Sequence, residues 1–315
     1  MRFAVHQENE SDVLSISQSC ASSLKRASSS SNCNKGHTFK EPPVFAETEY
    51  PKSVSVSELM QAGKLVKPKA RQKATLLLEK FDVKTGEWSV GASLELLVDV
   101  EKFSSGGFRD AFLATSSNPI DSQKWVIKKY NPKAKDAIKD TLKTTEEVHT
   151  RKQVQMHAVA RQLTKQFCSK VPNQFGQCFQ YNRVFFSQFE DEPATIEEFV
   201  PGNFIKYINN NGECCSLQQK CTAELKELRL KAECLVHYTF ESTNQKLMLL
   251  DIQGSGYQLY DPEIATAELC DNTSEIYFCC RNLSTIAMGE FSKKQVCNKY
   301  CEMLDLPEMP QDQFQ

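Results

Sequence analysis

The stretch Lys246–Pro262, KLMLLDIQGSGYQLYDP, gives the strongest indication of the fold and of the chemistry. It begins with a short apolar run, which is typical of a buried strand rather than a helix. Asp251 and Gln253 follow on one side of this strand because strand side chains alternate. Asp261 adds a second carboxylate next to Pro262. Two carboxylates and an amide at a strand end suit Mg²⁺, although a polar hairpin without chemistry is the alternative.

The composition is that of a globular protein. The chain has 315 residues, of which 40% are hydrophobic and 25% charged, so it is long enough for one large domain or two ordinary ones. The net charge of −2 gives no general attraction for nucleic acid or an anionic membrane. No apolar run approaches the roughly 20 residues of a membrane helix. We therefore expect no nucleic-acid partner and no membrane partner.

The cysteines and the N-terminal sequence predict a reducing compartment. Residues 5–17 are polar and acidic and lack the apolar centre of a signal peptide. The cysteine count, 13, is odd. We therefore expect a cytoplasmic protein whose cysteines are mostly free thiols, with a few as metal ligands.

The N-terminal part of the chain is predicted to be a tail. Residues 15–33 are dominated by serine and cannot bury enough apolar surface to offset the entropy of ordering. Residues 1–73 are expected to form this tail and a lead-in, residues 74–310 one ordered domain, and residues 311–315 a C-terminal tail.

A candidate phosphate site precedes Lys246–Pro262, which we call the organising stretch. Between residues 103 and 112, two serines and two glycines form a turn whose backbone N–H groups can approach phosphate, and Arg109 adds a forked cation. In the predicted strand Trp125–Tyr130, alternation places Lys128 on the inner face with Val126. The alternatives are a simple hairpin for the turn and, more suitably for Lys129, an exposed edge lysine.

Other periodic segments predict the remaining elements. We expect strands at 76–83, 94–100, 183–189 and 194–199, with a turn at 84–87 leading to Trp88, and helices at 144–167 and after an N-cap at Ser216.

A candidate zinc site combines two predicted helices. The helix after Ser216 carries His237 near its end. Cys297 and Cys301 are spaced i, i+4, which on a helix places both sulfurs on one side, as zinc requires. These three ligands are one short of a closed site, and a set of buried free thiols is the alternative.

Taken together, residues 74–310 resemble the catalytic domain of the alpha-kinases. These atypical protein kinases include the elongation-factor kinase, the myosin heavy chain kinases and the melastatin channel-kinases. The matching stretches occur in family order: GGFRDAF, WVIKKY, EEFVPGNFIKYINNNG, LVHYTFE, DIQGSGYQLYDP and, near the end, CNKYC.

The resemblance implies a fold and a role for each residue. The fold would be α+β, two-lobed and protein-kinase-like, with the nucleotide cleft between the lobes. Lys128 would hold the nucleotide phosphates, and Asp251 would orient or deprotonate the substrate hydroxyl. Gln253 and Asp261 would bind magnesium. The phosphate loop would comprise Gly106, Gly107, Phe108 and Arg109. The hinge that contacts adenine would comprise Glu197, Glu198 and Val200.

Two departures from the family pattern concern substrate and zinc. Residues 279–284 stand where the family carries a GxGNxG loop, but only the asparagine is kept. Gln295 stands where the family has a zinc-binding histidine, and glutamine is a poor zinc ligand. Zinc would therefore bind weakly, use water as its fourth ligand, or be absent.

The sequence thus predicts a serine/threonine protein kinase that uses ATP and Mg²⁺ to modify a protein substrate. The alternative is a pseudokinase that holds nucleotide or scaffolds a partner without transfer. The intact Lys128, Asp251, Gln253 and Asp261 favour catalysis, whereas the altered loop favours the pseudokinase.

Overall fold

The structure is a computed structural model that describes residues 55–61, 69–118, 120, 123–212, 222–268 and 284–310. The chain divides into two units, residues 1–66 and 67–315. The described part of the first unit contains helix α1 (Val56–Gln61), which begins where the Ser55 hydroxyl donates to the Glu58 carboxylate at 2.7 Å. All elements below belong to the second unit.

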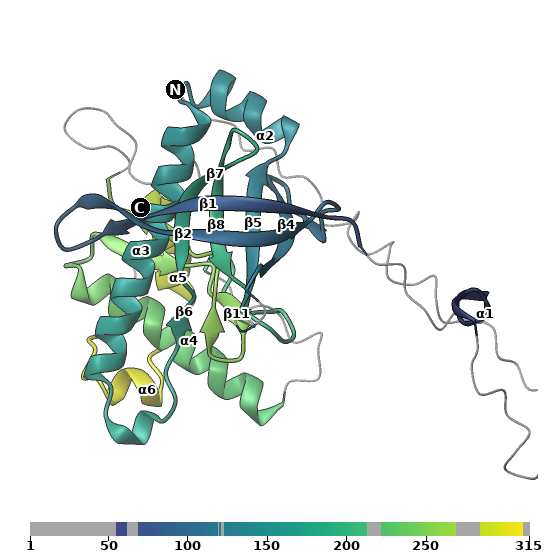
Figure 1. The fold of residues 1–315 in the computed structure, drawn as a ribbon. Coiled ribbons are helices and arrows are strands. Elements are labelled where there is room, and N and C mark those ends of the chain that lie inside the picture. The colour runs from purple at the N-terminus through teal and green to yellow at the C-terminus, as the bar shows by residue number, and fades with distance from the viewer. Residues whose placement is uncertain are drawn as a thin grey trace, which may run out of the picture. The chain divides into compact units, whose positions relative to one another are not determined.

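A seven-stranded sheet forms the first half of this unit, with the strand order β2-β1-β7-β8-β5-β4-β3 (Figure 1). Its strands are β1 (Arg71–Asp82), β2 (Glu87–Asp99), β3 (Ser104–Ser105), β4 (Arg109–Ser116), β5 (Lys124–Tyr130), β7 (Val184–Phe189) and β8 (Glu192–Glu198). β2 also pairs with β4, so the strands from β2 to β4 form a closed ring. All these pairings are antiparallel.

The sheet has an apolar core of its own. Leu76, Leu96, Ile127 and Ile196 are almost fully buried in it. Since side chains alternate along a strand, burying Ile127 in this core directs the next residue, Lys128, to the opposite face. The packing of the sheet therefore sets the direction of a candidate site residue.

The first two strands form the predicted hairpin, with one difference. β1 and β2 pair through the turn at 83–86, but residues 94–100 are not a separate strand, because β2 runs unbroken to Asp99. The pairing shifts register between Leu77 and Glu79, where β2 has one extra residue. A Cβ on Gly91 would lie 3.0 Å from the Leu78 carbonyl oxygen, so glycine suits this bulge. The bulge breaks the period-two pattern and hides the continuity of the strand.

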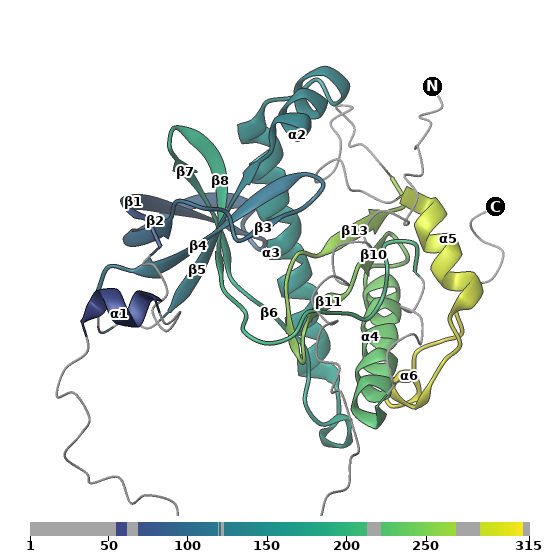
Figure 2. The ribbon, with the colours of Figure 1, turned by 90° about the vertical axis from the view of Figure 1, so that its right-hand side faces the viewer.

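Helix α3 (Glu146–Lys170) connects the two halves of the unit. Thr145 caps it by accepting the Val148 N–H at 3.2 Å, and Glu146 and Glu147 lie in its first turn, as the helix dipole favours. Figure 2 shows α3 between the seven-stranded sheet and helix α4 (Ala223–Ser242). The predicted helix is thus confirmed, and it carries residues that face both halves.

The second half packs helices around short strands and a larger apolar core. Its remaining elements, and the short helical segments on either side of α3, are α2 (Pro132–Asp136), a π-helical turn (Ala137–Thr141), a 3₁₀ turn (Asn173–Phe175), β6 (Gln180–Tyr181), β9 (Ile205–Lys206), β10 (Leu247–Leu250), β11 (Gln253–Ser255), β12 (Gln258–Leu259), β13 (Glu263–Thr266), α5 (Ser284–Lys294) and α6 (Lys299–Glu302). Phe167, Leu235 and Leu249 lie at the centre of this core with no exposed surface. Within the described ranges, no helix combines the length and apolarity that crossing a bilayer requires.

The start of α4 differs from the prediction. Its N-cap is Thr222, which accepts the Leu225 N–H at 3.2 Å, and the predicted cap, Ser216, lies outside the described residues. Both residues carry a hydroxyl that can cap a helix, so the sequence alone did not separate them.

The organising stretch folds as a strand, a loop and a hairpin. β10 is the predicted buried strand and pairs with β13, while β11 pairs with both β9 and β12. A Cβ on Gly254 would lie 2.0 Å from the Gln258 carbonyl oxygen, which no side chain tolerates. This backbone contact holds Gln253 and Asp261 at opposite ends of one tight hairpin.

We therefore expect Gly254→Ala to destabilise the domain. The added methyl must displace the backbone of β12, and overpacking of this kind costs about 2 kcal/mol or more. Urea unfolding of the full chain measures this loss. Gly107→Ala is the matched control, because a Cβ there meets nothing within 4 Å. Equal unfolding midpoints for the two variants would contradict the prediction.

Candidate active site

A cavity of about 480 Å³ opens beside the glycine turn, β5 and the end of β8. Its lining residues include Gly106, Gly107, Phe108, Arg109, Val126, Lys128, Glu197, Glu198, Val200, Tyr260 and Asp261. Segments that lie far apart in the sequence therefore meet here. Of the residues assigned to magnesium and catalysis, Asp261 lines the cavity, whereas Asp251 and Gln253 do not.

Lys128 is held between two carboxylates. Its Nζ lies 2.9 Å from Glu197 Oε2 and 3.5 Å from Asp261 Oδ1, and its side chain is only 15% exposed. A cation this deeply placed needs such partners. The two acids in the first turn of α3 pair elsewhere: Glu147 with Arg151 and Glu146 with Lys135.

Arg109 joins the same group of charges. Its guanidinium lies 2.5 Å from Asp261 Oδ1 and 3.8 Å from Glu197 Oε1, and it donates to Thr195 Oγ1 at 3.3 Å. We call Arg109, Lys128, Glu197 and Asp261 the charge cluster. It places two cations and two anions on one wall of the cavity.

The predicted hinge turns its two glutamates in different directions. Glu197 is buried and enters the charge cluster, whereas the Glu198 carboxylate accepts from Arg183 Nε at 2.7 Å. The Phe199 N–H donates to the Lys124 carbonyl at 3.0 Å, which fixes the backbone before Val200. The hinge therefore offers the cavity backbone and apolar surface rather than two free carboxylates.

Asp251 and Asp261 both adopt a left-handed backbone, with φ of 51° and 56°. This conformation is rare for residues other than glycine and clusters at functional sites. The Asp251 carboxylate is buried and lies 2.7 Å from Lys206 Nζ. Gln253 Nε2 donates to the Asp261 backbone carbonyl at 3.0 Å. The two magnesium candidates are thus tied to each other by a hydrogen bond.

A second group of ligating side chains lies in the other core. The ligand atoms of His237, Cys297 and Cys301 all lie within 4.8 Å of one another. The two cysteines do not share a helix as predicted, because α6 starts at Lys299 and Cys297 precedes its N-cap, Asn298. The cap turns the chain so that both sulfurs still face His237.

A third thiol beside this group, that of Cys234, was missed in the sequence. The Cys234 thiol contacts that of Cys301, and this contact lowers the pKa of Cys301 to about 5 and raises the pKa of Cys234. Cys234 precedes His237 by three residues on α4, and this spacing places both on one helix face. The i, i+3 pair was the available signal. Gln295 Nε2 lies 3.7 Å from Cys301 Sγ, so the glutamine also reaches the group.

One disulfide departs from the expectation of mostly free thiols. Cys168, at the end of α3, bonds Cys178, and their Cα atoms lie 5.8 Å apart. Of the cysteines in the described ranges, Cys234, Cys297 and Cys301 are free. The predicted glycine-loop substitutions at 279–284 fall outside the described residues, apart from the backbone of Ser284.

Comparisons with known proteins agree with the family resemblance found in the sequence. The family model for the alpha-kinase family matches residues 104–301. That span covers more than half of the chain. This chain belongs to the alpha-kinase family.

Relatives of this alpha-kinase are much longer than the chain. It is 26% identical over 243 residues to human transient receptor potential cation channel subfamily M member 6, covering 74% of this chain but 12% of that protein. It is 25% identical over 241 residues to human eukaryotic elongation factor 2 kinase, covering 72% of this chain and 29% of that protein. The chain thus spans a small part of these relatives.

Solved structures confirm the predicted fold. The truncated alpha-kinase domain of myosin heavy chain kinase matches with a TM-score of 0.60 and 19% identity, covering 76% of this chain and all of that domain. The alpha-kinase domain of myosin heavy chain kinase A in complex with ADP matches with a TM-score of 0.58 and 20% identity, covering 77% of this chain and 99% of that one. The chain therefore has the two-lobed α+β fold of an alpha-kinase domain.

A buried histidine supports the hinge from behind. His157 of α3 contacts Asn182 Oδ1 at 2.9 Å, and Asn182 Nδ2 donates to the Glu198 carbonyl at 2.9 Å. Burial lowers the pKa of His157 from its ordinary 6.5 to about 4. The folded protein therefore keeps this imidazole neutral where the unfolded chain protonates it.

This difference predicts a pH-dependent stability. Between the two pKa values the unfolded chain binds the proton, so the free energy of unfolding should fall as the pH is lowered. We expect a loss of about 2 kcal/mol from near-neutral pH to roughly pH 5 that His157→Gln lacks. Urea unfolding at several pH values measures it. Parallel stability profiles for the wild type and His157→Gln would show that another group is responsible.

Proposed function

We propose that this alpha-kinase transfers the γ-phosphoryl group of Mg-ATP to serine or threonine hydroxyls of a protein substrate. The supporting observation is the charge cluster, which sets two cations beside a glycine turn in a cavity of small-ligand size. We propose that the kinase domain spans residues 74–310 and acts in the cytoplasm.

The cations would bind the phosphates. Lys128 and Arg109 have their carboxylate partners within 4 Å, so both side chains are already oriented before ligand arrives. Charge-assisted bonds from a guanidinium fork and an ammonium suit phosphate oxygens. The backbone N–H group of Gly107 would add a contact that carries no side-chain bulk, whereas the Gly106 N–H already donates to the Arg109 carbonyl at 2.8 Å.

The carboxylates would bind the metal ion and accept the proton of the substrate hydroxyl. Gln253 and Asp261 would hold Mg²⁺, since both offer oxygen ligands and lie next to each other. Bound Mg-ATP would supply the phosphoryl group and neutralise its charge. Asp251 would orient the substrate hydroxyl and accept its proton as the new P–O bond forms and the bond to ADP breaks. The ammonium of Lys206, 2.7 Å away, compensates the Asp251 charge.

The second candidate function is a pseudokinase. It is favoured by residues 279–284, where the three glycines of the family pattern are replaced by Cys279, Arg281 and Ser284. A pseudokinase would bind nucleotide through the same cluster and transfer nothing. Binding and transfer must therefore be measured separately.

We expect Lys128→Met and Asp251→Asn to separate the two activities. Lys128→Met should weaken ATP binding by about 1.5–3 kcal/mol, because it removes a charged contact. Asp251→Asn should retain binding but reduce transfer of labelled phosphate to basic serine/threonine peptides by about 100-fold or more. Binding is measured by calorimetry and transfer by radiolabel.

The matched control is Lys129→Met, on the same strand but with its ammonium paired to Glu190 and Glu192. It should bind ATP as the wild type does. Unchanged affinity in Lys128→Met would refute the phosphate site. ATP binding without transfer in the wild type would establish the pseudokinase.

We also propose that the four side chains Cys234, His237, Cys297 and Cys301 hold a structural zinc. The family resemblance implies zinc at this place, and three thiols with one imidazole are a closed tetrahedral donor set. The ligand atoms of His237, Cys297 and Cys301 lie within 4.8 Å of one another, and the Cys234 thiol lies outside that group but contacts Cys301. Thiolate is a better zinc ligand than the Gln295 amide. Cys234 would thus replace the missing histidine.

We expect purified wild type to carry zinc, and Cys234→Ser to lose it to a chelator at least about tenfold more readily. Melting temperature should fall with the zinc, since a closed site contributes folding energy. Gln295→Ala is the matched control and should keep its zinc.

Gln295→His in the Cys234→Ser background should restore metal content by supplying the histidine that the family pattern has. Loss of zinc in Gln295→Ala instead of Cys234→Ser would assign the fourth ligand to the amide. Absence of zinc from all variants would show that the four residues are not a metal site.

A further inference from the structure

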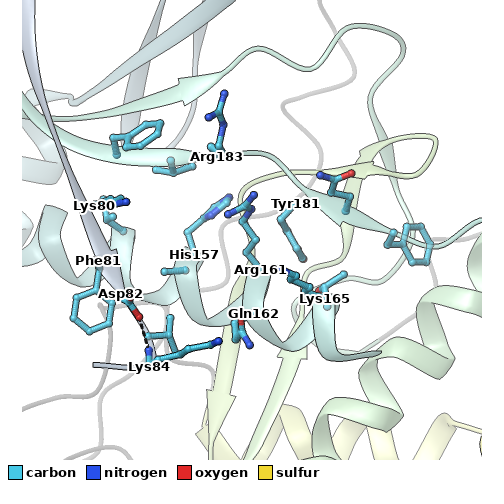
Figure 3. Close-up of a pocket in the computed structure, with 18 of the residues that line it drawn as sticks. Lys80, Phe81, Asp82, Lys84, His157, Arg161, Gln162, Lys165, Tyr181 and Arg183 are labelled. Atoms are coloured by element: carbon cyan, nitrogen blue, oxygen red, sulfur yellow. Dashed lines mark hydrogen bonds between the residues drawn. The ribbon is translucent and has the colours of Figure 1, made fainter. Parts of the chain in front are cut away.

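A second and larger cavity, of about 880 Å³, lies between the β1–β2 hairpin, α3 and the start of β7. Its rim carries five cations from three separate segments: Lys80, Lys84, Arg161, Lys165 and Arg183. Figure 3 shows the two lysines of the hairpin on one side and Arg161 and Lys165 of the helix on the other. This basic cavity shares no lining residue with the charge cluster.

Most of these cations have no acidic partner among the residues that the structure describes. Among the ion pairs that the described residues form, none involves Lys80, Lys84, Arg161 or Lys165. Elsewhere on this domain, cations such as Lys73 and Lys102 are matched by nearby acids. Like charges gathered around one hollow repel one another unless an anion enters.

The acids near the basic cavity do not neutralise it. Asp82, which lines it, accepts the Lys84 backbone N–H at 2.8 Å and so serves the hairpin turn, as the dashed line in Figure 3 marks. Glu198 pairs with Arg183 from outside the lining. The cavity therefore keeps a clear excess of positive charge.

Buried polar groups lie beneath the rim. The hydroxyls of Thr164 and Tyr181 are buried and have no hydrogen-bond partner, and both residues line the cavity. Leaving a buried hydroxyl unpaired is costly, so such groups call for an explanation. Both hydroxyl oxygens have almost no accessible surface, so a ligand in the cavity would contact the cations of the rim and not these hydroxyls.

The size and spacing of the cations indicate the class of ligand. A single phosphate or sulfate would leave most of the cavity volume empty. The volume is near the upper end of the range for small-molecule sites. Arginine forks and lysine ammonium groups are the usual partners of phosphate. The ligand should be compact and carry several phosphates around a small framework.

We propose that this basic cavity binds an inositol polyphosphate, either as a free molecule or as the headgroup of a phosphoinositide. A ring with phosphates on several sides matches cations that come from opposite walls. A nucleic acid is disfavoured because the net charge of the chain is −2 and the excess positive charge is confined to one hollow. A phosphopeptide would present one or two phosphates on a long chain and leave part of the rim unused.

The test is calorimetric titration of the full chain with inositol hexakisphosphate in the presence of saturating ATP, which removes the nucleotide cavity from the measurement. Wild type should bind with an affinity that falls steeply with salt. The Arg161→Gln/Lys165→Gln double variant should bind at least about tenfold more weakly, since two charged contacts are lost. Lys139→Gln/Lys226→Gln removes two exposed cations outside the cavity and should bind as wild type does.

Vesicles of phosphatidylcholine, with and without a phosphatidylinositol bisphosphate, distinguish the two sources. Binding to inositol hexakisphosphate without capture by the vesicles assigns a free ligand, and capture that Arg161→Gln/Lys165→Gln abolishes assigns a headgroup. Equal affinity in both double variants would overturn the proposal. So would displacement of the ligand by ATP, or selective binding of a singly phosphorylated peptide with no binding of inositol hexakisphosphate.

Discussion

The Asp261 carboxylate, shared between Arg109 and Lys128, is the contact on which the candidate active site depends. Each cation is 13–15% exposed, and an unpaired charge at that depth would be expensive. Pairing them with Asp261 and Glu197 keeps both ionised and stationary. The same geometry makes the cluster receptive, because an incoming polyanion can replace a carboxylate as the partner of a cation already in position.

This contact also joins the two halves of the domain. Arg109 and Lys128 belong to β4 and β5 of the sheet, whereas Asp261 follows the hairpin of β11 and β12. Its left-handed backbone, with φ of 56°, aims the carboxylate back at the sheet. The close approach of Gly254 to Gln258 holds the base of that hairpin. Strain at an aspartate is thus sustained by a tight backbone contact a few residues away.

Local patterns in the sequence predicted much of this arrangement. Alternation along Trp125–Tyr130 correctly grouped Lys128 with Val126, and both line the cavity. The apolar core of the sheet lies on the other face, that of Trp125 and Ile127, which the sequence had not assigned to the interior. The strand that ends just before Asp251 followed from its short apolar run. The resemblance to the alpha-kinases supplied the two-lobed fold, which periodicity alone does not specify.

What could not be predicted was long-range pairing. Nothing local says that Glu197 turns toward Lys128 while Glu198 turns toward Arg183, since this depends on the end of β8 in three dimensions. Cys234 was missed for the same reason, because its thiol becomes a candidate ligand only through its contact with Cys301, which is far away in the sequence. The Cys168–Cys178 disulfide departs from the expectation of mostly free thiols, which was based on the cysteine count and the N-terminal sequence. A disulfide is unusual in the reducing compartment that was inferred from them.

The two cavities lie back to back, and residues 181–183 form the wall between them. Tyr181 and Arg183 line the basic cavity, whereas Asn182 lines the candidate active site, as alternation along an extended segment requires. Arg183 and Asn182 both hold Glu198, one through its carboxylate and the other through its carbonyl. An anion that draws Arg183 away from Glu198 would therefore loosen one of the two restraints on the hinge. The segment 181–183 is therefore the part of the chain that both cavities use as a wall, although none of its residues lines both.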